Sequence, residues 1–156
     1  MAKLNILRLK TFHEKGDPEG YKAGWNRFGG RIGAKLIGGT IYDLPPGQSI
    51  CPYHFEYGDE EWLIVLQGRP TLRQPGGSRK LDEGDVVCFP PGPDGAHKVT
   101  NRTKETVRVL MISTKNEPSV AVYPDSDKVG VWPGLGAKNL MLKRKDGRVD
   151  YWEGEG

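Results

Sequence analysis

The chain has 156 residues, which is long enough for one domain with a buried core. Its 22 glycines and 12 prolines separate short apolar runs, a texture typical of an all-β protein with many turns. A net charge of only +3 and the lack of a long apolar run argue against nucleic-acid and membrane partners. With two cysteines and no apolar segment of signal-peptide length at the start, we expect a cytoplasmic protein without a disulfide framework.

Residues 1–30 show no sustained period, and we expect an extended N-terminal arm that packs on the rest of the chain. Short extended segments bounded by turn signals follow, at residues 36–44, 61–66, 70–73, 85–89, 98–101 and 106–113. Gln74 to Gly77 predicts a hairpin turn between two of them. Short strands with frequent turns predict a sandwich or barrel over residues 31–114.

Residues 115–156 are expected to form a C-terminal extension of the same structural domain. The part from Tyr123 to Val131 is polar and typical of a loop, whereas Leu140 to Lys145 could form a short strand. The acidic tail contains two aromatic residues and carries no recognisable chemistry.

Candidate metal ligands lie in two separate segments. Side chains two apart in a strand share a face, so His54 and Glu56 are predicted to point the same way. Glu61 could join them from a partner strand, and His97 lies further along the chain. Alone, each is more often a satisfied polar residue, but clustered His and Glu side chains indicate a nitrogen and oxygen site for a divalent metal.

Both segments resemble the motifs of the cupin superfamily. The first, from Gly47 to Gly68, is similar to G-x5-H-x-H-x3,4-E-x6-G. The second is similar to G-x5-P-x-G-x2-H-x3-N, and its matching residues are Gly84, Pro90, Gly92, His97 and Asn101. The resemblance covers residues 36 to 114 and identifies the chain as a small single-domain bacterial-type cupin.

Three departures from the motifs stand out. Glu56 occupies the position of the second histidine of the first motif. One extra residue separates Gly47 from His54, and two extra residues separate Gly92 from His97. The length changes fall at turns, whereas the change to glutamate alters the usual set of ligands.

The resemblance implies a jelly-roll barrel, or double-stranded β-helix, of two antiparallel sheets. It also implies one divalent ion (Mn²⁺, Fe²⁺, Ni²⁺ or Zn²⁺) at His54, Glu61 and His97, a set that leaves open coordination positions. We therefore expect a metal-dependent enzyme for a small polar metabolite, with isomerase, dioxygenase or decarboxylase chemistry. The alternatives are a binding module without turnover and a structural cupin with a vestigial metal site.

Glu56 admits three interpretations. As a fourth ligand, the interpretation we favour, it joins His54, Glu61 and His97 and selects harder ions; as a non-ligand it could be the general base of a catalytic site. In the third interpretation metal binding has been lost and Glu56 is a polar residue of the pocket. Without a cation, neighbouring carboxylates repel each other, and one of them must hold a proton.

Other candidates carry weaker signals. Arg73 and Arg108 lie in predicted strands, where they could clamp a substrate carboxylate or phosphate or simply face solvent. The aromatic residues Trp25, Tyr42 and Tyr53 could line the mouth of a pocket or belong to the core. Cys51 has strand parity opposite to His54 and is not expected to bind the metal.

The predicted strand from Trp62 to Leu66 is apolar on both faces. A sheet with one wet face should alternate, so the outer face of this strand must be covered by the N-terminal arm or by a second subunit. We predict a homodimer that binds a small molecule.

Overall fold

The computed structural model describes residues 3–145 and 147–156, which form strands, loops and short 3₁₀ turns. The strands are β1 (Gly24–Arg27), β2 (Ile37–Leu44), β3 (Phe55–Glu56), β4 (Glu61–Gln67), β5 (Thr71–Gln74), β6 (Gly77–Lys80), β7 (Val86–Phe89), β8 (Lys98–Thr100), β9 (Val107–Thr114), β10 (Ser119–Tyr123), β11 (Lys128–Trp132) and β12 (Leu140–Lys143). The 3₁₀ turns are η1 (Ile6–Arg8), η2 (Gly29–Ile32), η3 (Pro93–Gly95) and η4 (Pro124–Ser126). Within these described residues, no helix has the length and apolar character needed to span a bilayer. The predicted all-β class is confirmed.

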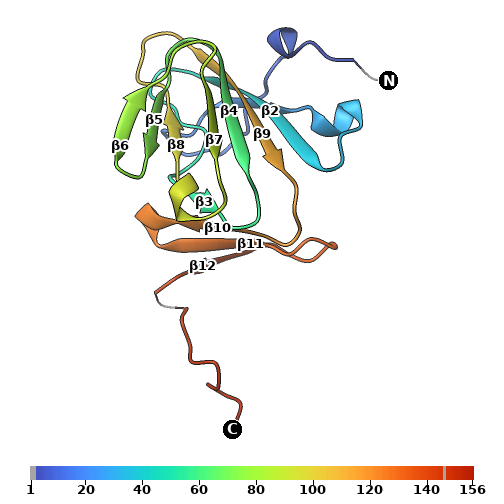
Figure 1. The fold of residues 1–156 in the computed structure, drawn as a ribbon, viewed down its shortest axis with the longest axis vertical. Helices are drawn as coiled ribbons and strands as arrows, with labels where there is room; N and C mark the ends of the chain where they lie inside the picture. Colours follow the sequence, from blue (N-terminus) through green and yellow to red (C-terminus); the bar gives the residue numbers. More distant parts are fainter. Residues whose placement is uncertain (1–2, 146) are drawn as a thin grey trace.

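The strands form an antiparallel jelly roll whose largest sheet has the order β1-β2-β9-β4-β7. Two smaller sheets, β6-β5-β8 and β12-β11-β10-β3, complete the fold (Figure 1). The sequence predicted two sheets, and the structure differs because the second layer is divided. Pro52 lacks an N–H donor and η3 interrupts the partner segment, so regular pairing between the two small sheets is reduced to the isolated bridge of His54 with His97 in the described part of the chain. The barrel therefore stays open beside these two residues.

The main core lies between the large sheet and the β6-β5-β8 sheet. Alternate residues of β4, Leu63 and Val65, point inward and pack with Val109 of β9 against Leu72 and Val99. All five are almost fully buried, and each contributes roughly 1.5–3 kcal/mol through removal from water.

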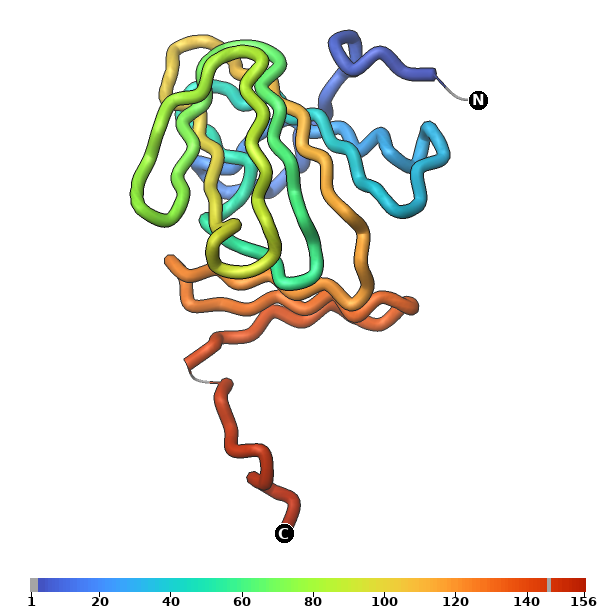
Figure 2. The backbone as a smooth tube through the Cα atoms, in the orientation of Figure 1, coloured from blue at the N-terminus to red at the C-terminus, as the bar shows by residue number. Residues whose placement is uncertain are grey.

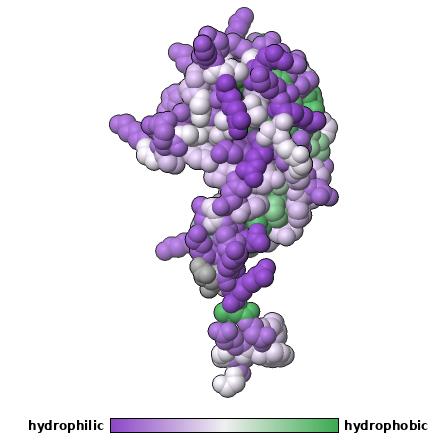
Figure 3. All heavy atoms as spheres, turned by 90° about the vertical axis from the view of Figure 1, so that its left-hand side faces the viewer, coloured by the Kyte–Doolittle hydropathy of each residue, from purple (hydrophilic) through white to green (hydrophobic). Residues whose placement is uncertain are grey.

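The N-terminal arm covers part of the outer face of the large sheet. Outward-facing Ile64 and Leu66 of β4 belong to an apolar cluster with Leu4, Ile6 and Leu9 of the arm. The arm therefore accounts for part of the cover that the two-sided apolar strand requires. The face drawn in Figure 3 is mostly hydrophilic, with some apolar patches between the polar side chains.

The segment from Tyr123 to Val131 was predicted as a loop, and this prediction was wrong. It contributes the end of β10, the η4 turn and most of β11. The alternating valines of these strands supply a half-buried face that the polar turn residues between them obscure in the sequence. β10 pairs with β3 and so closes the fold beside Glu56. The short strand predicted near Leu140 is present as β12, after which the chain extends away from the fold (Figure 2).

Candidate metal centre

His54 and His97 form a pair across two neighbouring segments. The N–H of His54 donates to the His97 carbonyl at 3.1 Å, and the N–H of His97 donates to the His54 carbonyl at 2.8 Å. Residues paired in this way share a face, and the two ring centroids are 4.7 Å apart. Glu61 begins β4 in the large sheet, so the two layers of the jelly roll meet at these three side chains.

Backbone carbonyls orient both imidazoles. His54 Nδ1 lies 3.1 Å from the Pro52 oxygen, and His97 Nδ1 lies 2.9 Å from the Gly95 oxygen. A carbonyl oxygen can only accept, so both Nδ1 atoms carry the proton and both Nε2 atoms keep a free lone pair. The two Nε2 atoms lie 3.7 and 3.5 Å from Glu61 Oε2.

Aromatic neighbours hold the rings in place. The His97 ring stacks on Phe89 with centroids 3.7 Å apart and planes within 8°. Tyr123 of β10 stacks on His54 at 5.7 Å and 18°. The donor atoms therefore point at a common position before any ligand arrives.

The donor set fits a divalent transition metal. One ligand atom from each of His54, Glu61 and His97 lies within 4.8 Å of the others. Two imidazole nitrogens and a carboxylate oxygen suit Mn²⁺, Fe²⁺, Ni²⁺ or Zn²⁺ and leave coordination positions open.

The electrostatics of the three residues also fit a cation. Burial, followed by repulsion from Glu56 and Asp59, raises the pKa of Glu61 to about 8. Burial and then the neighbouring His54 lower the pKa of His97 to about 3, and burial lowers the pKa of His54. At neutral pH the imidazoles are unprotonated ligands, and the carboxyl group lacks the positive partner that would stabilise its charge.

Glu56 lies in the same pocket but outside the group of three. Glu56, His54, Glu61 and His97 all line a cavity of about 270 Å³, as the shared strand face predicted. Burial, then repulsion from Asp59 and the hydrogen bond that protonated Glu56 donates to Asp59, raise the pKa of Glu56 to about 7. The carboxyl group is thus directed towards Asp59, and its role as a fourth ligand or a base stays a prediction.

Asp59 is a site residue that the sequence did not reveal. This buried carboxylate accepts hydrogen bonds from Thr114 Oγ1 and the Asn116 N–H, both at 2.9 Å, and from Ser119 Oγ at 3.0 Å. Its position in the Gly-Asp-Glu-Glu turn is typical of a solvent-exposed loop, and only the distant partners make it buried. Asp59 links the turn before β4 to the start of β10 and places a negative charge behind Glu56.

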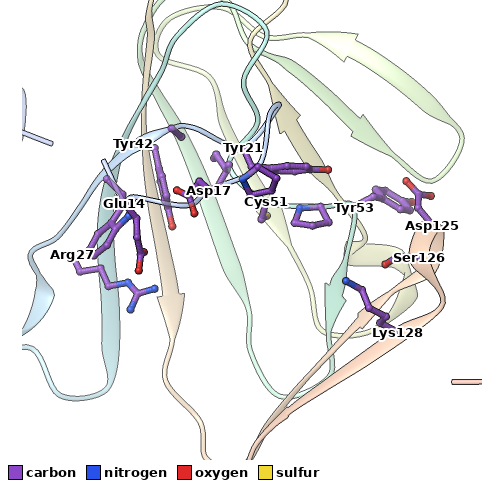
Figure 4. Close-up of a pocket in the computed structure, with 15 residues that line it drawn as sticks. Glu14, Asp17, Tyr21, Arg27, Tyr42, Cys51, Tyr53, Asp125, Ser126 and Lys128 are labelled. Atoms are coloured by element: carbon purple, nitrogen blue, oxygen red, sulfur yellow. The ribbon is translucent and has the colours of Figure 1, made fainter. Parts of the chain in front are cut away.

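A larger cavity of about 660 Å³, which we call the vestibule, adjoins the metal pocket (Figure 4). The two cavities share Arg27, Tyr42, Ile50 and Cys51. Trp25, Tyr42 and Tyr53, the aromatics considered for a pocket mouth, all line the vestibule. Cys51 faces both cavities although its strand parity predicted otherwise, because the chain bends at Pro52, and its Sγ lies 3.5 Å from His54 Nδ1.

The two arginines proposed for substrate lie elsewhere. Arg73 forms a two-bonded ion pair with Asp125, at 2.6 and 2.9 Å, and its guanidinium lies 3.9 Å from the centre of the Tyr53 ring. Arg108 points outward, where it binds Asp43 and the carbonyls of Leu7 and Leu9. Neither lines the metal pocket or the vestibule.

Comparison with known proteins bears directly on this geometry. Residues 40–113 match the family model described as "Cupin domain", within the region whose motifs resemble cupins. This part of the chain is a cupin domain. It contains all three residues of the candidate metal centre. A comparison with curated proteins finds no match.

Solved structures show the same fold over most of the chain. A candidate sugar phosphate isomerase from Acidithiobacillus ferrooxidans is 27% identical, with a TM-score of 0.81 and coverage of 92% of this chain and 91% of that one. A protein from Silicibacter pomeroyi, named a sugar phosphate isomerase of the cupin superfamily, is 22% identical, with a TM-score of 0.80 and 94% coverage of both chains. A polyketide cyclase from Streptomyces resistomycificus shares 21% identity at a TM-score of 0.61, covering 76% of this chain and 83% of that one. The fold that this chain shares with the first two structures therefore extends beyond its residues 40–113.

Proposed function

We propose that this cupin domain is a metal-dependent isomerase of small polyhydroxylated carbonyl compounds. The observation that carries the proposal is the convergence of His54, Glu61 and His97 on one pocket that also contains a separate carboxyl group, Glu56. The likeness at 27% identity to a candidate sugar phosphate isomerase supports the same chemistry.

The four residues have two roles: three of them hold the metal ion, and Glu56 transfers the proton. A divalent ion held by His54, Glu61 and His97 would supply Lewis-acid polarisation of a substrate oxygen. Glu56 takes the proton from the hydroxyl-bearing carbon next to the carbonyl group and returns it to the former carbonyl carbon. The hydroxyl proton passes to the former carbonyl oxygen, so that the carbonyl and hydroxyl positions exchange. A single base on the pocket wall suits such a transfer because proton donor and acceptor are adjacent atoms of one substrate.

The placement of Glu56 favours isomerisation among the three reaction types expected for the fold. Its carboxyl group faces the cavity from β3 and is held near Asp59, apart from the three ligand atoms. A group that must gain and lose a proton needs such freedom from the metal. Burial beside Asp59 also keeps its pKa near neutrality.

We further propose that the protein is a homodimer formed through the outer face of β4 and β7. Trp62 and Val86 remain 43% and 54% exposed there, outside the cover that the N-terminal arm provides. Trp62 lies opposite Cys88 and Ile64 opposite Val86, so these side chains share the outward face.

Metal content and turnover test the isomerase proposal together. Protein purified without a metal-affinity column should carry close to one divalent ion per chain by elemental analysis, and His97→Ala should lose most of it. Glu56→Gln should keep the ion and lose the isomerisation of an aldose and aldose phosphate panel, followed by NMR. Glu105→Gln, a change at an exposed position, is the matched control and should keep both.

Specific outcomes would contradict the proposal. Wild-type protein that is metal-free and ignores added Mn²⁺, Fe²⁺, Ni²⁺ and Zn²⁺ would favour a structural cupin. A ligand that binds to the metal-loaded chain and returns unaltered by mass spectrometry would favour a binding module. If Glu56→Gln keeps full metal and full turnover, Glu56 has no part in catalysis; if Glu56→Gln loses the metal, Glu56 is a fourth ligand.

A further inference from the structure

The vestibule is built largely by segments outside the region matched by the family model. From the arm and β1 come Glu14, Asp17, Pro18, Tyr21, Ala23, Trp25 and Arg27, and from the segment after β10 come Asp125, Ser126 and Lys128. In Figure 4 the labelled side chains of these segments lie on either side of the vestibule. Two of these residues carry positive charge and lie on opposite sides of the cavity.

Arg27 reaches the boundary between the two cavities. In the pairing of β1 with β2, Arg27 lies opposite Thr40 and Trp25 lies opposite Tyr42. Paired residues share a face, and these four side chains line the vestibule, the metal pocket or both. The guanidinium lies 5.1 Å from the centre of the Trp25 ring. In the described part of the chain no carboxylate forms an ion pair with it.

Lys128 approaches from the opposite wall. It begins β11 and lies opposite Tyr123, whose ring is 5.6 Å from the ammonium nitrogen. Tyr123 also stacks on His54, so its ring connects the wall that carries Lys128 to the metal centre, although Lys128 lines the vestibule and not the metal pocket. Its ammonium group likewise has no ion-pair partner among the residues that the structure describes. In Figure 4 the side chains of Arg27 and Lys128 extend towards the opening from either side.

The vestibule also contains three acidic residues, Glu14, Asp17 and Asp125, and within the described part of the chain none of them forms an ion pair with either cation. Asp125 is already bound by Arg73 through two hydrogen bonds. Glu14 and Asp17 line the wall formed by the arm, where their carboxylates can accept hydrogen bonds from hydroxyl groups. Among the described residues, the cavity thus offers an anion two cations that have no ion-pair partner, together with acceptors for hydroxyls and aromatic faces for a carbon skeleton.

We infer that the vestibule binds the phosphate group of a phosphorylated substrate between Arg27 and Lys128. The inference rests on the proposed function, because the carbonyl end of the same molecule would occupy the metal pocket. A guanidinium group can bind phosphate through two parallel hydrogen bonds, and an ammonium group adds a mobile point charge. Residues outside the matched cupin region would then select phosphorylated substrates over free sugars.

Phosphate binding to the full-length chain tests the inference directly. Inorganic phosphate should shift the indole N–H resonance of Trp25, which packs against Arg27, in two-dimensional NMR titrations. Arg27→Gln and Lys128→Gln should each weaken phosphate binding roughly tenfold or more, the range expected for a hydrogen bond to a charged group. Arg79→Gln and Lys80→Gln on exposed β6 remove the same charges outside both cavities and should leave the affinity unchanged.

The same variants separate this inference from the proposed function. If phosphate affinity is equal in Arg27→Gln, Lys128→Gln and wild type, or falls equally in all four variants, the phosphate site is overturned. Preference for free sugars over their phosphates in an active enzyme would also overturn it while leaving the isomerase intact. If the wild-type protein binds no divalent metal, even when metal is added, but still binds phosphate through Arg27 and Lys128, the isomerase proposal is overturned and the phosphate site stands.

Discussion

Of the three candidate ligands, Glu61 is the residue whose charged form would gain most from a bound cation. Its carboxyl group is buried between two imidazoles that are themselves held neutral, and its pKa is raised to about 8. A protonated carboxyl group is a poor ligand, so the ion and the proton compete for the same oxygen. The chemistry of the site therefore depends on pH through this residue.

Metal affinity should fall as the pH is lowered from 8. The carboxylate form of Glu61 binds the ion, so each pH unit below its pKa of about 8 should weaken binding about tenfold. Above that pH the affinity should level off. Calorimetry in buffers of different ionisation enthalpy should show release of close to one proton at pH 7. Affinity that does not change between pH 6 and 8 would contradict the raised pKa.

The folding stability of the metal-free protein should depend on pH in the opposite direction to metal affinity, and should fall as the pH rises. Because the folded-state pKa of Glu61 is raised from 4.5 to about 8, the folded chain holds more protons than the unfolded chain between these values. The stabilisation that results from the raised pKa of Glu61 is complete below pH 4.5 and is lost as the pH rises through 8. Glu61→Gln cannot ionise, so its urea midpoint should decline less than that of the wild type between pH 6 and 9. An identical decline would contradict this assignment.

Gly95 is required by the backbone that holds His97. A Cβ atom at this position would lie 1.9 Å from the Pro90 oxygen, and the Gly95 carbonyl accepts the Nδ1 proton of His97. Gly95→Ala should destabilise the fold by about 1–3 kcal/mol in urea and weaken metal binding, because the carbonyl must move. Gly30→Ala, with open space around its Cβ, should change neither measurement. Unchanged metal affinity in Gly95→Ala would show that the carbonyl does not position the ring.

At the scale of elements, the extensions at both ends complete the cupin domain. β10 pairs with β3 beside Glu56, and the arm packs on the outer face of the large sheet. Arg108 ties the arm down through Leu7 and Leu9 and binds Asp43 with two bonds of 2.7 Å. Burial alone would raise the pKa of Asp43, but hydrogen bonds from Arg108 and Thr11 outweigh it and lower the value.

Arg108→Ala should therefore detach the arm and destabilise the protein. Asp43 would keep only the hydrogen bond from Thr11, and the Leu7 and Leu9 carbonyls would lose the bonds that Arg108 donates. We expect the free energy of unfolding, measured in urea, to fall by about 2 kcal/mol. Proteolysis should cut the first ten residues faster in this variant. Arg69→Ala breaks an exposed pair with Asp82 and should cost about 0.5 kcal/mol or less. Equal losses in the two variants would assign Arg108 no special part in holding the arm.

At the scale of the whole molecule, part of the outer face of the large sheet is apolar and is not covered by the N-terminal arm. β7 is the edge strand of the large sheet, and both Val86 of β7 and Trp62 of the adjacent β4 are exposed. An exposed edge with apolar side chains is a common site of self-association. The homodimer predicted from the two-sided strand would bury it.

Light scattering should give the mass of two chains at micromolar concentration. Trp62→Glu should shift it to one chain by placing a charge in the apolar interface, while metal content stays unchanged because this side chain faces away from the site. Leu140→Glu on β12, which is similarly exposed, is the control and should leave a dimer. A monomeric wild type would contradict the dimer and mean that the partial cover by the arm is sufficient for this face.

The sequence by itself determined the all-β class, the cupin domain and the three residues of the candidate metal centre. Strand periodicity and motif spacing are local properties, so they place His54, Glu61 and His97 on inward faces before the fold is known. Only the tertiary structure decided that Glu56 faces Asp59, that Arg108 binds the arm and that the vestibule exists. Each depends on sheet register between distant segments, such as β3 with β10 and β1 with β2, which no local pattern encodes.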